Sequence, residues 1–210
     1  MSAKFENIVG VVLAGGKSIR MGGGDKCLLE LNGRYILDYV IDRVKHQVNK
    51  LVLNANGDAS RFSNFNLPVV NDSFDGFAGP LAGILTGMEW TIKNEPEVDW
   101  IATFASDVPF LPLDTVEKLS SSITANCSDM ACAMSGGRYH PVIGLWPVRL
   151  YEELLNALTN EGIRKIDDWT IGFKRSSADF SGIGIDPFFN INRPEDLTKA
   201  IKYLISIQKS

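Results

Sequence analysis

The segment from Val11 to Lys26, VVLAGGKSIRMGGGDK, places five glycines and three cationic side chains directly after an apolar run. The cations are Lys17, Arg20 and Lys26, and a single carboxylate, Asp25, opposes them. Successive amides in a glycine-rich turn after a strand point their N–H groups into one concavity, which suits an anion. Arginine adds a planar fork for phosphate oxygens, and lysine adds a point charge. The pattern predicts a phosphate-binding loop; the alternative is a surface turn with solvated charges.

Two common phosphate-binding motifs do not fit the spacing of this loop. The residues Gly16-Lys17-Ser18 resemble the end of a P-loop, but that motif requires glycine where Val11 stands. A GxGxxG fingerprint that starts at Gly22 requires glycine where Cys27 stands. The spacing therefore disfavours a P-loop enzyme and a dinucleotide-binding oxidoreductase.

The chain resembles the molybdenum cofactor guanylyltransferases, a branch of the nucleotidyltransferases. Its segment LAGGKSIRMGGGDK is similar to the LAGGxSxRMGxxDK signature of that family. Further similar segments follow in the family's order: GPLAG at 79–83, SDVPFLP at 106–112, HPV at 140–142 and FNINRPEDL at 189–197. Ile19 departs from the pattern, because the family often has a second arginine at that place.

The resemblance implies a reaction between GTP and the molybdopterin-bound molybdenum cofactor. The products would be a guanine dinucleotide cofactor and pyrophosphate. A terminal phosphate oxygen of the pterin would attack the α-phosphorus of GTP and displace pyrophosphate. Because both reactants are anionic, we expect catalysis to depend on positioning and charge neutralisation.

The resemblance also gives the loop residues their expected roles. The amides of Ala14, Gly15 and Gly16 are expected to cradle the triphosphate. Arg20 and Lys26 are expected to hold the pyrophosphate and to stabilise the charge that develops on it. With Asp107, these two cations form the predicted catalytic set.

Other nucleotide-binding residues are expected where strands end. Asp107, at the end of a central strand, is predicted to bind Mg²⁺, with Mn²⁺ as the alternative ion, because Mg²⁺ takes one or two carboxylates plus substrate phosphates. The alternative for Asp107 is a plain turn residue before Pro109. Leu13, Asn54 and Asp72 resemble the family's nucleoside-binding positions. Whether Asp72 meets the base, the ribose or the metal region stays open.

A second group of residues is expected to contact the molybdopterin acceptor. It consists of Gly79, Pro80, Gly83, His140, Asn190 and Asn192. Each has a structural alternative: Gly79 to Gly83 could simply start a helix, and His140 could make only a local hydrogen bond. Asn190 and Asn192 could serve as turn and capping residues before the Pro194 helix.

The alternation of apolar and amphipathic segments predicts the scaffold that positions these residues. Strands are expected at 8–14, 50–54, 67–71, 100–105, 129–134, 141–146, 174–179 and 184–188, and helices at 34–47, 80–93, 113–123, 150–158, 163–169 and 194–207. Alternating strands and helices predict an α/β fold: a mostly parallel twisted sheet with helices on both faces, Rossmann-like. Ligands of such sheets bind outside the carboxyl ends of the strands, where the predicted site residues lie.

Length and composition favour one domain that covers residues 1–210, with 45% hydrophobic and 22% charged residues. We expect nucleotide binding in about residues 1–112 and acceptor binding in about residues 113–210. A net charge of -4 argues against a nucleic-acid partner. Three cysteines and two histidines, without a CxxC pair, argue against a zinc site or a disulfide framework.

The sequence contains no apolar run long enough for a membrane span, and its first residues do not resemble a signal peptide. We therefore expect a cytoplasmic protein that does not bind membranes, with a monomer as the default. The resemblance adds molybdenum-insertion and molybdoenzyme maturation proteins as candidate partners.

Two further functions compete with guanylyl transfer. One is a related cytidylyl or uridylyl transferase, but those relatives tend to have LAAG where this chain has Leu13-Ala14-Gly15-Gly16. The other is a non-catalytic module that binds and delivers the cofactor. Such a module would not need both Lys26 and Asp107, so their joint presence favours an enzyme.

Overall fold

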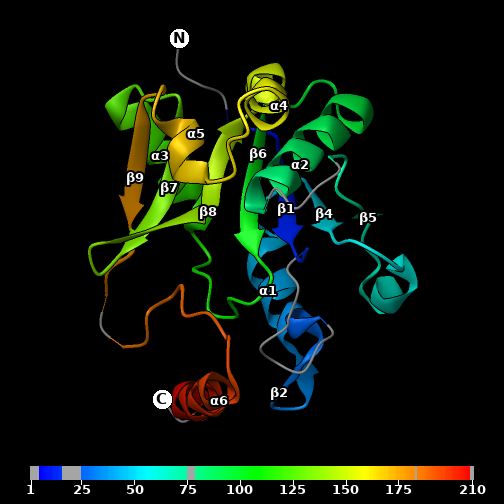
Figure 1. Cartoon of the computed structure of the whole chain (residues 1–210). Coiled ribbons are helices and arrows are strands. Elements are labelled where there is room, and N and C mark those ends of the chain that lie inside the picture. Colours follow the sequence, from blue (N-terminus) through cyan, green and yellow to red (C-terminus); the bar gives the residue numbers. More distant parts are fainter. Residues whose placement is uncertain (1–4, 16–24, 75–78, 183, 209–210) are drawn as a thin grey trace.

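A computed structural model describes residues 5–15, 25–74, 79–182 and 184–208 of the chain. Its centre is a seven-stranded sheet in the order β5-β4-β1-β6-β8-β7-β9 (Figure 1). The strands are β1 (Ile8–Leu13), β4 (Lys50–Asn54), β5 (Val69–Val70), β6 (Trp100–Ala105), β7 (Met130–Ser135), β8 (Arg138–Pro147) and β9 (Arg175–Asp179). A separate two-stranded hairpin consists of β2 (Glu30–Leu31) and β3 (Arg34–Tyr35).

The parallel part of the sheet is built from short apolar strands. β1 pairs in parallel with β4 on one side and with β6 on the other, and β4 pairs in parallel with β5. β8 runs antiparallel to both of its neighbours, whereas β9 is again parallel to β7. The chain moves outward to β4 on one side of β1 and later returns to β6 on the other side. The carboxyl ends of β1 and β6 therefore form the topological switch point, where doubly wound sheets bind ligands.

Helices cover both faces of the sheet. On one face, α1 (Ile36–Val44) and α3 (Thr115–Asn126) join β1 and β6 in one buried apolar cluster. On the other face, α2 (Pro80–Asn94), α4 (Tyr151–Thr159) and α5 (Ile166–Thr170) pack in a second cluster (Figure 1). The short 3-10 helices are η2 (Lys26–Leu28), η3 (Ala59–Phe65) and η4 (Val148–Leu150). The predicted α/β fold class is confirmed.

The last helix, α6 (Pro194–Gln208), lies apart from both faces, beyond the carboxyl ends of the strands (Figure 1). Ala200 and Leu204 of α6 share a third apolar cluster with Leu31, Ile36 and Phe110. The carboxyl-terminal segment therefore returns to the hairpin near the start of the chain and closes one side of the switch point.

Several predicted elements differ from the observed ones. The helix predicted at 34–47 begins only at Ile36, because residues 34–35 form the second strand of the hairpin. The helix predicted at 163–169 is reduced to Ile166–Thr170, and the strand at 67–71 to Val69–Val70. The strand predicted at 184–188 is wrong: these residues form turns and bends that lead to α6. β8 is longer than predicted, since it extends from Arg138 to Pro147.

None of the described helices is long and apolar enough to cross a membrane.

Candidate active site

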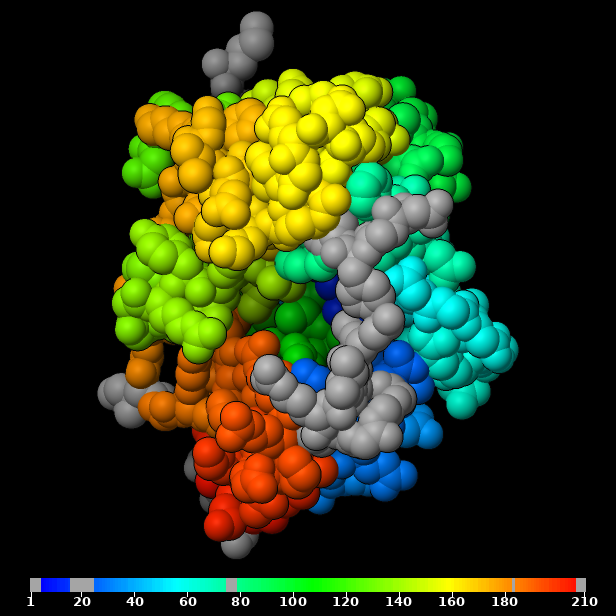
Figure 2. Space-filling view, in the orientation of Figure 1, coloured from blue at the N-terminus to red at the C-terminus, as the bar shows by residue number. Residues whose placement is uncertain are grey.

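The ends of β1 and β6 meet at the switch point and bring two predicted segments together. Ser106 N–H donates a hydrogen bond to Leu13 O at 3.2 Å, which aligns the two strand ends. Ala14 N–H donates to Asn54 O at 2.8 Å and so continues the parallel pairing with β4. Figure 2 shows a hollow on this face where blue, green and orange parts of the chain meet. The sheet bond of Ala14 occupies an amide that was predicted to cradle the triphosphate.

Lys26, Asp107 and Asn192 converge beside these strand ends. Lys26 is the first residue of η2, and its Nζ donates to Asn192 Oδ1 at 2.6 Å although 166 positions separate the two residues. The same Nζ lies 3.7 Å from Asp107 Oδ2, and both side chains are mostly buried. Ile191 N–H donates to Asp107 O at 3.0 Å, so the backbone fixes the segment that carries Asn192. A cation, a carboxylate and an amide from three distant segments are thus held in contact.

Burial decides the electrostatics of this cluster. Removal from water raises the pKa of Asp107, and the neighbouring Lys26 ammonium acts in the opposite direction by favouring the ionised carboxylate. Burial likewise raises the pKa of the Cys27 thiol to about 12, with the Asp25 charge as a second cause. Cys27 is therefore a neutral packing residue at neutral pH. Additional positive charge near Asp107 would stabilise its ionised form.

Asp72 anchors a second polar cluster at the ends of β4 and β5. Its Oδ1 accepts from Asn54 Nδ2 at 2.9 Å, and its Oδ2 accepts from Asn56 Nδ2 at 2.7 Å. The Asp72 N–H donates in turn to Asn56 Oδ1 at 2.8 Å. A Cβ on Gly15 would lie 3.4 Å from Asn56 Nδ2 and 4.0 Å from Asp72 Oδ2. The backbone of Gly15 therefore lies next to this cluster. A side chain at this position would reduce the space beside the Asp72 carboxylate.

Asn56 was not predicted from the sequence. It is two residues beyond Asn54, and in extended backbone such residues face the same side. That spacing in the segment Asn54-Ala55-Asn56 was the available signal.

The start of α2 packs tightly against the strand ends. Gly79 has a φ of 61°, which favours glycine, and Pro80 follows at the first helical position. A Cβ on Gly83 would lie 2.6 Å from both Asn54 Oδ1 and Leu13 Cδ2. Gly83 therefore permits the close approach of α2 to two predicted nucleoside-binding residues. Its packing role is visible, and the structure places it on the nucleotide side of the site.

The chain is similar to known proteins over most of its length. The model of the MobA-like NTP transferase domain matches residues 10–174. A molybdenum cofactor guanylyltransferase of Rhodopseudomonas palustris (strain BisB5) is 48% identical over 90% of both chains. The guanylyltransferase of Shewanella sp. (strain MR-4) is 39% identical over 88% of this chain and 90% of that relative.

The chain belongs to the molybdenum cofactor guanylyltransferase family.

Solved structures show that the guanylyltransferase fold is shared more widely. Molybdopterin-guanine dinucleotide biosynthesis protein A of Archaeoglobus fulgidus superposes with a TM-score of 0.73 at 21% identity and covers 95% of this chain and 99% of its own. The 4-diphosphocytidyl-2C-methyl-D-erythritol synthase of Anaerococcus prevotii also reaches 0.73, at 15% identity, with coverage of 95% and 96%. At such identities the superpositions demonstrate the fold alone. The predicted family and fold are both confirmed.

His140 belongs to a hydrogen-bonded chain in this guanylyltransferase. Ser135 Oγ donates to Asp186 Oδ1 at 2.7 Å and lies 2.8 Å from His140 Nε2. Because a carboxylate only accepts, the single Ser135 hydrogen points to Asp186 and His140 Nε2–H donates to Ser135. The His140 ring also packs on Phe188, with centroids 4.7 Å apart. The local hydrogen bond that was the structural alternative for His140 is observed.

Of the remaining predicted site residues, Asn190 and Asn192 lie within the described parts of the chain. Asn190 is exposed beside buried Ile191, and Asp196 Oδ2 accepts from Asn192 N–H at 3.0 Å. This capping bond is the turn role that was the alternative for Asn192, and it coexists with the contact to Lys26. Gly16 and Arg20 lie outside the described residues.

No group of three or more His, Cys, Asp or Glu side chains within the described ranges could hold a metal by itself. At the switch point the predicted metal ligand is one carboxylate, Asp107, next to the place where substrate phosphates are expected. That chemistry fits Mg²⁺, which keeps several waters and uses few protein ligands.

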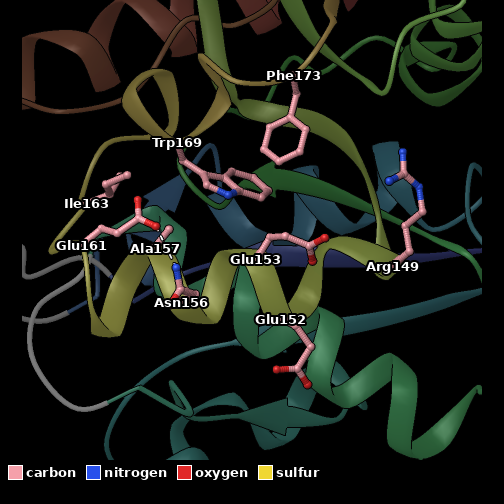
Figure 3. A pocket seen from close by; sticks show the side chains of 9 residues that line it. All are labelled: Arg149, Glu152, Glu153, Asn156, Ala157, Glu161, Ile163, Trp169 and Phe173. Carbon is pink, nitrogen blue, oxygen red and sulfur yellow. Dashed lines mark hydrogen bonds between the residues drawn. The ribbon is translucent and has the colours of Figure 1, made fainter.

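A separate open depression of about 690 Å³ lies between α4 and α5 (Figure 3). The rings of Trp169 and Phe173 form one wall, and Glu153 and Asn156 of α4 face them. Trp169 Nε1 has no hydrogen-bond partner among the described residues. None of the predicted site residues in the described ranges lines this depression, so the candidate site at the Lys26 cluster is separate from it.

Proposed function

We propose that the protein transfers GMP from GTP to the molybdopterin-bound molybdenum cofactor, with release of pyrophosphate and formation of molybdopterin guanine dinucleotide. The contact of Lys26 with Asp107 and Asn192 at the switch point carries this proposal, because it places a cation and a carboxylate where the fold binds ligands. The names of the relatives at up to 48% identity supply the nucleotide and the acceptor.

The chemistry requires charge control at two oxygens. A terminal phosphate oxygen of the acceptor forms a bond to the α-phosphorus of GTP, and the bond between that phosphorus and the bridging oxygen to the β-phosphate breaks. The bonding electrons leave with pyrophosphate. We assign Lys26, together with Arg20, to the charge that develops on this leaving group. Asn192 holds the Lys26 ammonium in place, because its Oδ1 accepts from Nζ.

Asp107 is the proposed ligand of Mg²⁺, with Mn²⁺ as the alternative. A divalent ion bound there would neutralise phosphate charge and, as Lys26 already does, favour the ionised form of the buried carboxylate.

The nucleoside part of GTP is assigned to the second polar cluster. Leu13, Gly15, Asn54 and Asp72 border one space at the ends of β1, β4 and β5, where both Asp72 oxygens already accept amide hydrogen bonds. A guanine presents N–H donors, and the carboxylate oxygens and backbone carbonyls of this region can accept them. The Ala14 amide stays in the sheet, so Gly15 and Gly16 remain the proposed phosphate cradle.

The acceptor is assigned to the side of the hollow that lies opposite the second polar cluster. Here Asn190 and Asn192 follow the His140–Ser135–Asp186 chain. Gly79 and Pro80 at the start of α2 are also assigned to the acceptor, whereas Gly83, predicted with them, packs against Leu13 and Asn54 on the nucleotide side. Apart from these α2 residues, the assignments keep the proposed division of one domain into a nucleotide part at about 1–112 and an acceptor part at about 113–210. We extend the proposal to a cytoplasmic monomer that meets molybdenum-insertion and molybdoenzyme maturation proteins.

A nucleotide panel tests the proposed function. Purified protein with Mg²⁺ and molybdopterin-loaded acceptor receives GTP, CTP, UTP or ATP, and pyrophosphate release is measured. Release with GTP alone is the expected result. Release only with CTP would make the protein a cytidylyltransferase, and GTP binding without release would favour a non-catalytic carrier.

A further inference from the structure

Arg61 is held by contacts on every side of its guanidinium group. It lies on η3, where Nη1 donates to Asp58 O at 2.8 Å and Nη2 donates to Asn56 O. Its Nε is 2.5 Å from Asp25 Oδ2, and Nη2 is 3.4 Å from Asp25 Oδ1. The Nε–H makes no hydrogen bond within the described residues, so the contact with Asp25 combines an ion pair at Nε with a hydrogen bond that Nη2–H donates to Oδ1. Its Cζ also lies 4.8 Å from the centroid of the Phe62 ring.

These contacts join two parts of the site that are distant in sequence. Asp25 immediately precedes Lys26, whose ammonium contacts Asp107 and Asn192. Asn56 holds both Asp72 Oδ2 and the Asp72 N–H. A single side chain therefore connects the start of η2 with the cluster at the ends of β4 and β5.

We propose that Arg61 is a positioning residue for the transfer reaction, which fixes Lys26 through Asp25 and Asp72 through Asn56. The proposal rests on the function proposed above. By holding both segments at once, Arg61 sets the distance between the group that meets the pyrophosphate and the cluster that meets the nucleoside. The polar contacts of Arg61 are with Asp25, Asn56 and Asp58, so its proposed role is exerted through Asp25 and Asn56.

The chemistry of arginine explains why this position requires it. A planar guanidinium presents donors in several fixed directions, so it can engage the Asp25 carboxylate and two backbone carbonyls simultaneously. A lysine ammonium at the same place could approach one of these groups but could not maintain all three. The Arg61–Asp25 pair is 29% and 17% exposed at its side chains, which protects it from solvent better than the Arg34–Asp42 pair at 48% and 44%.

Arg34 and Asp42 provide the matched control. They form an Arg–Asp pair at 2.6 Å on the surface of the β3–α1 region, and their other ion-pair and ring partners among the described residues are Lys45 and Tyr39, neither of which belongs to the proposed site. Loss of such an exposed pair changes stability little. Arg34→Met therefore removes the same kind of side chain and the same kind of ion pair without any path to Lys26 or Asp72.

The experiment measures kcat, KM for GTP, the Kd of GTP and Tm for wild type, Arg61→Met, Arg61→Lys, Asp25→Asn and Arg34→Met. We expect Arg61→Met and Arg61→Lys to lose at least about tenfold in kcat/KM while Arg34→Met matches wild type. The double variant of Arg61→Met with Asp25→Asn should be little worse than Arg61→Met alone, because the contact that Asp25→Asn weakens is already absent in Arg61→Met. A further variant, Arg61→Ala, leaves space for a free guanidinium ion. Guanidinium chloride at millimolar concentration should restore part of the rate that this variant loses.

Three results would overturn the positioning role. The first is a kcat/KM of either Arg61 variant equal to that of wild type. The second is a loss of activity that the unfolded fraction at the assay temperature fully explains. The third is a double variant whose loss in kcat/KM equals the product of the losses in the two single variants. Measurements on the wild-type protein distinguish a failure of this inference from a failure of the proposed function. If wild type binds GTP but transfers nothing, guanylyl transfer fails, and the Kd values decide for Arg61: a Kd unchanged by Arg61→Met rejects it and a weakened one supports it.

Discussion

Asp107 is a residue whose local environment opposes its charge. Burial raises its pKa, and Lys26 only partly compensates for the lost hydration. Burial of the Asp107 carboxylate does not by itself favour folding. Ionisable groups in unfavourable surroundings are common at functional sites.

The substitution Asp107→Asn is therefore expected to change activity and stability in different directions. It removes a charge that is costly to bury but retains the size of the side chain. We expect Tm to stay equal or to rise, while transfer falls by about a hundredfold or more and no longer responds to Mg²⁺. A coupled pyrophosphate assay over a Mg²⁺ titration and thermal unfolding measure the two effects. Wild-type Mg²⁺ dependence in this variant would remove Asp107 from the metal site.

Residues of the site differ in how far the sequence could predict them. Asn54 ends β4, Asp107 lies two residues after the end of β6, and Lys26 ends a glycine-rich loop, so position in the sequence pointed to them before any contact was known. Asn56 and Arg61 gave only weak signals, since asparagine and arginine after a strand are common in solvated turns. Their roles arise from contacts between η2, η3 and β5, and no local pattern contains such contacts.

At the scale of elements, helix α2 approaches the sheet through two glycines. Gly83 faces Leu13 and Asn54, and one turn later a Cβ on Gly87 would lie 2.6 Å from Val11 Cγ2. The helix thereby sets how Asn54 is held against the site.

We expect Gly83→Ala to damage both stability and nucleotide binding. The added methyl group would lie too close to both Asn54 Oδ1 and Leu13 Cδ2, so both side chains must shift, and over-packing of this kind costs about 1–3 kcal/mol. KM for GTP should rise because Asn54 moves. Gly172→Ala is the matched control: a Cβ there meets nothing within 4 Å, so its unfolding free energy should equal that of wild type or exceed it slightly. Urea denaturation measures both, and equal effects of the two substitutions would contradict the close-approach explanation.

The segment between β9 and α6 is held by the His140–Ser135–Asp186 chain rather than by sheet pairing. Asp186 Oδ1 also accepts from Phe188 N–H at 2.9 Å, which shapes the turn before Asn190. Burial lowers the pKa of His140 below its ordinary value of 6.5; Asp186 acts against this shift, and Arg138 reinforces it.

The depressed pKa of His140 predicts a specific acid sensitivity. Below pH 6.5 the unfolded chain binds a proton that folded His140 resists, so the stabilisation present above pH 6.5 is lost as pH falls through the folded pKa. We expect the unfolding free energy of wild type to decrease in this window more than that of His140→Gln. His46→Gln serves as control, because His46 is exposed and is the other of the chain's two histidines. Parallel pH profiles for wild type and His140→Gln would contradict the prediction.

Elements with a strong apolar pattern were predicted well, and those fixed by turns were not. β4 and β6 match their predicted bounds, since unbroken apolar runs identify buried strands. The β2–β3 hairpin was missed although Asn32 and Gly33, with φ of 52° and 80°, form a two-residue turn that Asn-Gly favours. Its strands have only two residues each, so they offered no periodicity to detect.

At the scale of the whole molecule, the chain closes on itself through α6. The family model matches residues 10–174, but Asn192 and α6 lie beyond that range. Ile191 shares the third apolar cluster with Ala200 of α6 and with Leu31 of the hairpin. The position of Asn192 beside Lys26 therefore depends on packing between the two ends of the chain.

This closure predicts that a buried charge in α6 impairs transfer at a distance from the chemistry. Ala200 is fully buried, so Ala200→Asp places an unpaired carboxylate in the third cluster and should lower the unfolding free energy by about 3 kcal/mol or more. We expect α6 to separate first, because the two main clusters do not contain it. The contact of Asn192 with Lys26 would then be lost while the sheet remains folded.

Far-UV circular dichroism, urea denaturation and kcat/KM measure this separation, with Thr198→Asp on the exposed side of the same helix as control. Full activity in Ala200→Asp would show that Asn192 reaches Lys26 without the support of α6, and it would remove the carboxyl-terminal closure from the mechanism.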